Sequence, residues 1–358
     1  MDIQLQSDTS SLVSYEERQF IVHHVHAFVN EKEEYGNPAG VVVIDDKNEF
    51  PLKNETMINV ARQVGYPETA FLQLRTDDKK SSFDVDVRFA TPVSANGFCG
   101  HATVATFGFL VNRKLISNNA VYKMRTTVLA KESSDPVLAI MSIKCSHNFI
   151  EMEQNLPIFY EVDDVELITE KVAKSLNLPL SLIDHVEIVN TGGKDAIISL
   201  KEKEALDNVK LTDDICKMIS EVSQIYQIVG YHLFPLDGVF HDTNLSPHGI
   251  INVTVKGVRN FAPLEGIPEE PATGSACGAT ACFIVKNIIL PSFQKMKEID
   301  LDDKIRVNIA FEQGKVFGCP SIIYSDVLYD RKIDAFISVK VSGRSKEEPN
   351  KQSFVIIK

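Results

Sequence analysis

The sequence predicts an α/β (mixed α+β) fold of two similar lobes, each a rolled β-sheet around a central helix. Two observations support this prediction. Small residues around a Cys-Gly pair occur twice, at 96–103 and 274–280, and each copy leads into an apolar helical run. The order of strands, helix, strands, Cys-Gly loop, buried helix and strands recurs in both halves, and 358 residues suffice for two full cores.

The first half predicts a polar tail followed by the first lobe. Residues 1–19 are rich in Ser, Gln, Asp and Glu, which predicts a disordered tail and places the first lobe at 20–150. A helix is expected at 54–64, where apolar residues recur at helical spacing behind a cap at Asn54. The other expected elements are strands at 20–29, 41–44, 68–72, 83–89, 120–128 and 137–144, a turn at 36–40, and a helix at 96–111.

The second half repeats this order. The segment 145–160 has a weak pattern and marks the expected boundary, so the second lobe spans 155–344. The expected elements are helices at 163–176, 203–208, 212–221 and 273–288, and strands at 186–189, 195–200, 226–234, 250–256, 305–311 and 334–341.

Composition excludes several classes of function. The formal net charge is −12 without a long Lys/Arg run, so we expect no nucleic-acid partner. We expect no membrane association, because no stretch approaches about 18–20 apolar residues and the first residues lack a signal peptide. The six cysteines are scattered without a CxxC pair, as in the reduced thiols of a cytoplasmic protein.

No cofactor is indicated by the motifs. His23, His24 and His26 lack the further ligands that a metal site needs, so we expect no metal. The glycine loops match neither a Walker motif nor a dinucleotide-binding fingerprint, so no nucleotide is expected.

Glu68 is a candidate for proton transfer. It stands just ahead of an apolar strand, and burial would raise its pKa towards the range useful for acid–base catalysis. The alternative is a solvated loop glutamate or a helix-end cap, since most glutamates are exposed.

Cys99 and Cys277 form a matched pair, each directly before a glycine. A thiol at a helix N-terminus has a lowered pKa, and two facing thiols could move a proton across a carbon atom. Both could instead be small buried packing residues, as free cysteines often are. Gly100 and Gly274 would open the two helix N-termini, whose unpaired N–H groups grip a small anion from both sides.

Polar residues around the two loops are further candidates. His101 could contact a ligand or be a core histidine bonded to a backbone carbonyl. Ser275 could contact a ligand, or it or Thr273 could cap a helix. Glu270, in the pair with Glu269, supplies a carboxylate, although such a pair is usually solvated.

Taken together, these segments resemble the PhzF-like (phenazine-biosynthesis-like) family, relatives of diaminopimelate epimerase. The resemblance covers about residues 20 to 322, nearly the whole chain. The matching runs, in the family's order, are GNPAG at 36–40, ETAF at 68–71, FATP at 89–92, CGHAT at 99–103, RNFAP at 259–263, EEPATGSA at 269–276 and QG at 313–314.

The resemblance implies a diaminopimelate-epimerase-like fold in which the C-terminal strand, 345–358, returns to the first lobe. It also implies a homodimeric, biosynthetic isomerase without cofactor or metal, in which a glutamate moves a proton on a small carboxylic acid. That glutamate falls on Glu68. The family's other functional positions fall on His101, Glu270, Ser275 and the substrate-side Asn37.

The chain departs from the family pattern at four positions. Glu270 replaces an aspartate and reaches one methylene further, and Ala95 stands where glutamate is frequent. Cys319 replaces an arginine, and His26 replaces an aspartate of the first strand. These changes concern the contacts to the substrate.

Three hypotheses follow for the function. The first is a PhzF-like isomerase in which Glu68 takes a proton from a small carboxylic acid and returns it. The second is an epimerase or racemase that uses Cys99 and Cys277, which match the catalytic cysteines of diaminopimelate epimerase. The third is a non-catalytic protein that binds a small carboxylate between its lobes.

Overall fold

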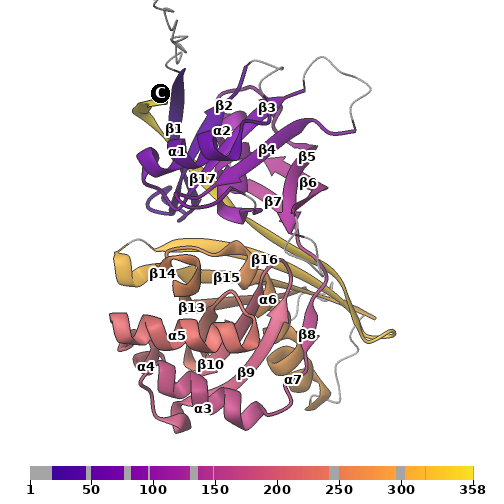
Figure 1. Ribbon diagram of the computed structural model, residues 1–358. Helices are drawn as coiled ribbons and strands as arrows, with labels where there is room; N and C mark the ends of the chain where they lie inside the picture. Colours follow the sequence, from indigo (N-terminus) through magenta and orange to yellow (C-terminus); the bar gives the residue numbers. More distant parts are fainter. Residues whose placement is uncertain are drawn as a thin grey trace, which may run out of the picture.

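The computed structural model describes residues 18–45, 50–75, 82–95, 97–129, 136–147, 149–241, 250–295, 303–318 and 320–357. Most of the predicted tail, together with Asn96 and Cys319, lies outside these residues. Arg18 and Gln19, which were assigned to the tail, already belong to the first strand, β1 (Arg18–Val29). The chain forms two lobes, one above the other in Figure 1, and one long strand runs through both.

The first lobe is a closed ring of strands around helix α2 (Gly100–Asn112). Residues 101–110 of α2 are all buried, which explains why this helix is apolar on every side. Helix α1 (Asn54–Val64) packs on the outside of the ring. The strands, in order round the ring, are β1, β2 (Asn37–Val43), β3 (Glu68–Leu74), β4 (Val85–Ala90), β5 (Ala120–Leu129), β6 (Pro136–Ser146), β7 (Phe149–Glu153) and the end of β17 (Ala335–Ile357).

The second lobe curves its sheet around helix α6 (Gly274–Ile284), which is equally buried. The sheet runs β8 (Ile158–Tyr160), β9 (Ile183–Asn190), β10 (Lys194–Leu200), β11 (Tyr231–Pro235), β13 (Ile250–Ala262), β15 (Lys304–Gln313), β16 (Ser321–Asp330) and the start of β17. The short strands β12 (Val239–His241) and β14 (Ile267–Glu270) pair with β13.

Three helices cover the outer face of this second sheet, opposite α6 (Figure 1). They are α3 (Val165–Ser175), α4 (Lys203–Asp207) and α5 (Asp213–Tyr226). A π-helical turn, Val285–Ile289, continues α6 into α7 (Leu290–Lys295). The second lobe therefore has two cores, one around α6 and one beneath α3 and α5.

Strand β17 links the lobes. Its first part pairs with β16 in the second lobe, Lys340–Arg344 pairs with β7, and Arg344–Ile357 pairs with β1. Residues 345–357 thus lie against the first strand of the chain. At this crossing Ser345 packs so closely on α2 that a Cβ added to Gly108 would lie 1.6 Å from the Ser345 Oγ atom.

The structure corrects several local predictions. The predicted turn at 36–40 is largely the start of β2. Asn54, expected as the cap of α1, is instead its first helical residue, and the N-cap residue, Lys53, makes no side-chain cap bond. The predicted strand at 226–234 is shorter, because α5 continues to Tyr226. Strands β7, β8, β12, β14 and β16 were not predicted.

The prediction that no stretch is apolar enough to cross a membrane is wrong for one segment. Among the described residues, the helical run Gly274–Ser292 is long and apolar enough by length and composition. Most of this run is buried inside the second lobe, where it is the core helix, and this burial accounts for its apolar side chains.

Candidate active site

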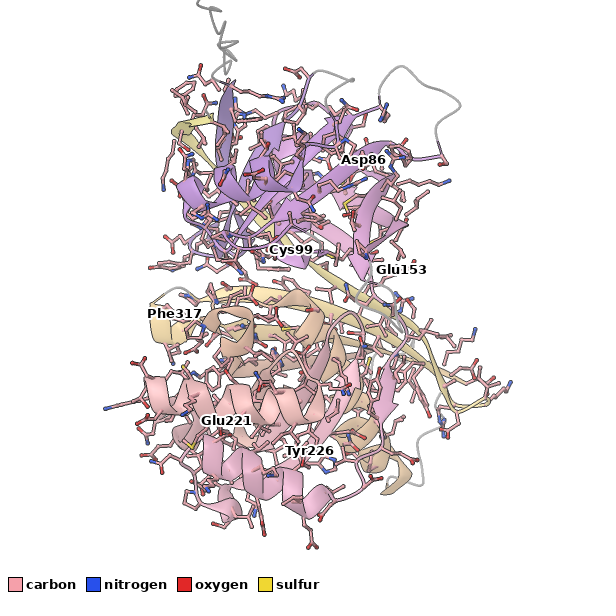
Figure 2. All side chains as sticks on the ribbon, in the orientation of Figure 1. Asp86, Cys99, Glu153, Glu221, Tyr226 and Phe317 are labelled. Atoms are coloured by element: carbon pink, nitrogen blue, oxygen red, sulfur yellow. The ribbon has the colours of Figure 1, made fainter. Side chains whose placement is uncertain are left out.

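Both central helices begin where the two lobes meet. Figure 2 shows Cys99, the N-cap residue of α2, at the end of the first lobe that faces the second. Helix α6 begins after Thr273, and the two helices touch each other. Intrahelical bonding starts with the N–H groups of Thr103 and Cys277. The N–H groups of the three residues before each therefore have no partner within their own helix.

The carboxylate of Glu270 joins the two lobes. Its Oε1 atom accepts a hydrogen bond from Asn37 Nδ2 at 3.0 Å and lies 3.3 Å from His101 Nδ1. Its Oε2 atom accepts from the Thr273 hydroxyl at 2.7 Å. One side chain of β14 thus contacts β2 and α2 of the first lobe and the N-cap of α6. We call this meeting point of Asn37, His101 and Glu270 the seam.

Buried polar contacts fix the strand that carries Glu270. The adjacent Glu269 accepts two hydrogen bonds from Arg259, at 2.8 and 2.7 Å, and this ion pair is almost fully buried. Arg259 also donates to the backbone carbonyls of Leu206 and Val209. On the other side, Gln313 donates to the backbone carbonyl of Glu270 at 2.8 Å. These contacts leave β14 little freedom to move the carboxylate.

Glu68 is the first residue of β3 and is partly buried at the same seam. Burial raises its pKa to about 8, and the negative charge of Glu270 adds to this increase. A hydrogen bond from the Cys99 thiol acts in the opposite direction. Glu68 is therefore mainly protonated at neutral pH, with a usable fraction ionised, so it can both accept and donate a proton.

The two cysteines do not have the lowered pKa that their position at helix N-termini predicts. Burial raises the pKa of both thiols well above the ordinary value, and the charge of Glu270 adds to the effect in both. The Cys99 sulfur lies 3.2 Å from His101 Nδ1. Cys277 is fully buried, with its sulfur 3.7 Å from His232 Nε2. Desolvation outweighs the helix dipole at both positions.

The remaining predicted residues differ in their contacts. His101 faces Cys99 and Glu270 rather than a backbone carbonyl. Thr273 occupies the N-cap position of α6 but makes no cap bond; its hydroxyl donates to Glu270 and accepts from Gln313 at 3.1 Å instead. Ser275 contributes its backbone carbonyl, which accepts from Thr191 at 3.2 Å. Its hydroxyl has no hydrogen bond to any residue that the structure describes.

Sequence reasoning missed two titratable residues beside the seam. Asp195 of β10 is only 3% exposed, and burial together with the charge of Glu270 raises its pKa to about 7. His232 of β11 is fully buried, contacts Thr280 of α6 at 2.6 Å, and has its pKa lowered to about 3 by burial. Both lie in apolar strands, where periodicity gives no sign of a polar role. Across the described residues no cluster of three or more potential metal ligands occurs.

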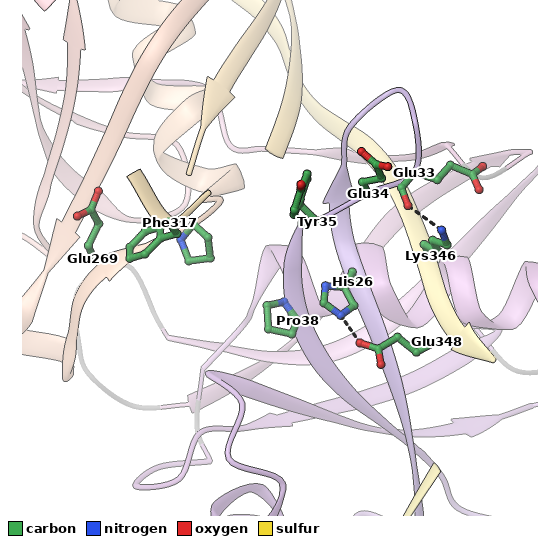
Figure 3. Close-up of a pocket in the computed structure, with 11 residues that line it drawn as sticks. His26, Glu33, Glu34, Tyr35, Pro38, Glu269, Phe317, Lys346 and Glu348 are labelled. Atoms are coloured by element: carbon green, nitrogen blue, oxygen red, sulfur yellow. Dashed lines mark hydrogen bonds and ion pairs between the residues drawn. The ribbon is translucent and has the colours of Figure 1, made fainter. Parts of the chain in front are cut away.

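Two departures from the family pattern lie away from the seam. Ala95 is buried in the outer core of the first lobe, with residues of α1. His26 Nε2 donates to Glu348 Oε1 at 2.6 Å, in a groove of about 600 Å³ that Figure 3 shows. The groove is lined by Pro38 and Pro271, the neighbours of Asn37 and Glu270, so it lies directly outside the seam.

Comparison with known proteins places these observations in a family. The model of the phenazine biosynthesis-like protein family (PhzC-PhzF) matches residues 25–345. The uncharacterized isomerase YfhB of Bacillus subtilis is 31% identical over 289 residues, 78% of this chain and 88% of the relative. An uncharacterized isomerase of Clostridium acetobutylicum is 29% identical over 92% of this chain and 96% of its own length.

Solved structures agree with the fold. The PhzF-family phenazine biosynthesis protein of Bacillus anthracis superimposes with a TM-score of 0.68 at 22% identity, over 95% of this chain and 100% of its own. A predicted epimerase of Pseudomonas aeruginosa has a TM-score of 0.62 at 19% identity, over 95% and 100%. The two-lobed fold with a sheet rolled around each helix is thus the diaminopimelate-epimerase-like fold. With nearly the whole chain matched, this protein belongs to the phenazine biosynthesis-like (PhzC-PhzF) family.

Proposed function

We propose that this protein is a cofactor-independent isomerase that moves a proton on a small carboxylic acid bound at the seam, with Glu68 as the group that takes and returns the proton. The observation that carries the proposal is the Glu68 carboxyl, whose pKa of about 8 suits both halves of the reaction. The names of the bacterial relatives, uncharacterized isomerases, support the reaction class.

The proton balance of this reaction is simple. The ionised Glu68 carboxylate removes a proton from a carbon beside the substrate's unsaturated or acidic group, leaving an enolate-like anion. The protonated Glu68 then returns the same proton to another carbon, which yields an isomer and restores the carboxylate. Because one carboxylate does both, the proton leaves and returns on one face of the substrate.

The surrounding groups would hold the substrate and the developing charge. The first N–H groups of α2, from Gly100, and of α6, from Gly274, lack partners within their own helices and are suited to a carboxylate or an enolate oxygen, although those of His101 and Ala102 also face the Cys99 sulfur. Removing one such donor typically costs about 2.7–4 kcal/mol of transition-state stabilisation. Asn37, His101 and Glu270 would orient the substrate, and Ser275 would contact it from the first turn of α6.

The proposal extends to the setting of the enzyme. The resemblance to PhzF-like proteins supports a homodimer in a biosynthetic pathway, and the scattered cysteines support a cytoplasmic location.

A deuterium-exchange screen tests the function. The protein is incubated in D2O with a panel of small carboxylic acids, and loss of C–H signals is followed by NMR. We expect exchange with at least one acid, and a fall of at least about 10²-fold in Glu68→Gln, since general acid–base groups contribute 10²–10⁴-fold. Glu55→Gln, an exposed position on α1, is the matched control.

Two results would contradict the proposal. Unchanged exchange in Glu68→Gln would remove Glu68 from the reaction. Tight binding of an acid to the wild-type protein without any exchange would favour the non-catalytic carboxylate-binding protein.

A further inference from the structure

Asp195 is a buried carboxyl group that the proposed reaction does not use. It is the second residue of β10. Ile197, two residues further, packs into the core around α6, whereas Ala196 and Ile198 pack on the opposite side with α3 and α5. Because alternate residues of a strand share a face, the Asp195 side chain points towards α6.

The loop before Asp195 runs along the first turn of α6. Thr191 donates to the carbonyl of Ser275, and a Cβ on Gly192 would lie 3.6 Å from the Ser275 Cβ atom. The Asp195 Oδ2 atom lies 3.3 Å from the place that a Cβ on Gly193 would take. The carboxyl group is therefore folded back over this loop, beside the start of α6.

Asp195 has no hydrogen bond or ion pair with any residue that the structure describes. On β13, two strands away across β11, the Asn260 Oδ1 atom is buried without a hydrogen-bond partner among the described residues. An unpaired ionised carboxylate is costly to bury, so the neutral acid is the favoured form. A neutral carboxyl group is a hydrogen-bond donor, and this one has no acceptor among the described residues.

The charges at the seam also favour the neutral form of Asp195. No described Lys or Arg forms an ion pair with Glu68, Glu270 or Asp195, and a carboxylate substrate would add a further negative charge. Like charges held close together in a partly desolvated site repel, so a carboxyl group that stays protonated there lowers the cost of binding a further anion. The other titratable neighbours, Cys277 of α6 and His232 of β11, are neutral at neutral pH, because burial raises the pKa of the thiol and lowers that of the imidazole.

We propose that Asp195 binds the substrate as a neutral carboxylic acid, donating a hydrogen bond to the substrate carboxylate beside the N-terminus of α6, so that substrate binding is coupled to retention of a proton. This inference rests on the proposed function, since it takes the substrate to be a small carboxylic acid. Asp195 then supplies the side-chain donor of the carboxylate pocket, and the first N–H groups of α6 supply the rest.

Binding of three acids that differ at one position tests the proposal. Propionate, lactate and alanine carry a hydrogen, a hydroxyl or an ammonium group on the same carbon skeleton. Their dissociation constants are measured by ligand-detected NMR at pH 6 and pH 8.5, with the full-length Glu68→Gln protein, so that Glu68 does not titrate. The variants added are Asp195→Asn, which keeps a donor, Asp195→Ala, which has none, and the exposed control Asp163→Asn.

We expect the affinity for the acids to depend on pH through the titration of Asp195. In Glu68→Gln, propionate and lactate should bind roughly 30-fold more weakly at pH 8.5 than at pH 6, which is the change in the protonated fraction of a group with a pKa of about 7. Adding Asp195→Asn should remove this dependence and keep the affinity seen at pH 6. Adding Asp195→Ala should weaken binding at both values, and Asp163→Asn should change nothing.

Three results would overturn the inference. The first is a pH dependence that survives Asp195→Asn. The second is a preference for alanine that disappears in Asp195→Asn, which would mean that an ionised Asp195 binds an ammonium group. The third comes from NMR of the ligand-free protein with ¹³C-labelled aspartate, in which the Asp195 carboxyl signal is identified by its absence from the Asp195→Asn spectrum. A titration of that signal below pH 5 would contradict the inference.

Failure of the inference and failure of the proposed function remain distinguishable. If Asp195 stays protonated near neutral pH but none of the three acids binds at 50 mM, the coupling to carboxylate binding is refuted. The deuterium-exchange screen with wild-type protein then decides separately whether the isomerase proposal stands.

Discussion

The His101 Nδ1 atom lies 3.3 Å from the Glu270 Oε1 atom, across the seam between the two lobes. The imidazole belongs to the second residue of α2, and the carboxylate belongs to the last residue of β14. Their separation is therefore set by how the lobes are held together. Because the same carboxylate raises the pKa of Glu68, the position of one lobe influences proton affinity in the other.

Removing the charge of Glu270 should move the activity profile to lower pH. In Glu270→Gln the pKa of Glu68 falls, so the ionised base forms earlier, and we expect the acid limb of kcat/KM to shift down by about one pH unit. Deuterium exchange measured from pH 5 to pH 9 shows the shift. Glu265→Gln, at an exposed position nearby, should leave the limb in place, and an upward shift in Glu270→Gln would contradict the assignment.

Removing the thiol of Cys99 should have the opposite effect. The thiol's hydrogen bond lowers the pKa of Glu68, so Cys99→Ala should move the acid limb to higher pH while exchange continues. Cys277→Ala should also retain exchange. Both thiols should react slowly with iodoacetamide at pH 7.5, since their pKa values are raised. Loss of exchange in both variants, or rapid inactivation by the reagent, would instead support the two-cysteine epimerase or racemase.

The raised pKa of Glu68 should also appear in the stability of the protein. A carboxyl group that holds its proton more tightly when folded stabilises the native state below its unfolded pKa, near 4.5, and loses that contribution as pH rises through about 8. The free energy of unfolding of wild type should therefore fall between pH 5 and pH 9 by more than that of Glu68→Gln. Urea unfolding at several pH values measures this, and equal slopes in the two proteins would contradict it.

The close packing of β17 on α2 predicts that a substitution at Ser345 restores the stability lost by a substitution at Gly108. Gly108→Ala should destabilise the protein by about 1–3 kcal/mol, because the new Cβ would overlap the Ser345 hydroxymethyl group. In Gly108→Ala with Ser345→Gly, the nearest Ser345 atom left is the Cα, at 3.9 Å, so most of the loss should be recovered. Denaturant unfolding provides the measurement, with Gly97→Ala as the control in open space. Additive losses in the double variant would contradict this packing.

The central architecture could be predicted from the sequence because its signals are local. The helices that begin at Gly100 and Gly274 consist of small, apolar residues on every side, which is typical of a helix buried all round. The family motifs then supplied the fold. The C-terminal strand is harder to see, because β17 is one strand of 23 residues that serves both lobes, whereas its sequence suggested two separate segments.

The contacts of the site could not be predicted, because they join elements distant in the sequence. Asn37, His101 and Glu270 lie on β2, α2 and β14, and no spacing rule brings three such elements together. Which of the two interpretations of Cys99 holds could not be decided from the sequence for a different reason. Its place at a helix N-terminus was predicted correctly, but the burial and neighbouring carboxylates that raise its pKa are visible only in three dimensions.

The path of β17 also bears on how the protein is made. The ring around α2 needs residues 340–357 of β17 between β7 and β1, so the first lobe is completed only after the second lobe has been synthesised. During synthesis, at roughly 5–20 residues per second, the edges of β1 and β7 that later bind β17 remain unpaired. Such unpaired backbone edges are templates for pairing with other chains. A prematurely terminated product would therefore have an open first lobe with unpaired strand edges. In such a product the N-terminal half would be the part most exposed to cellular proteases and chaperones.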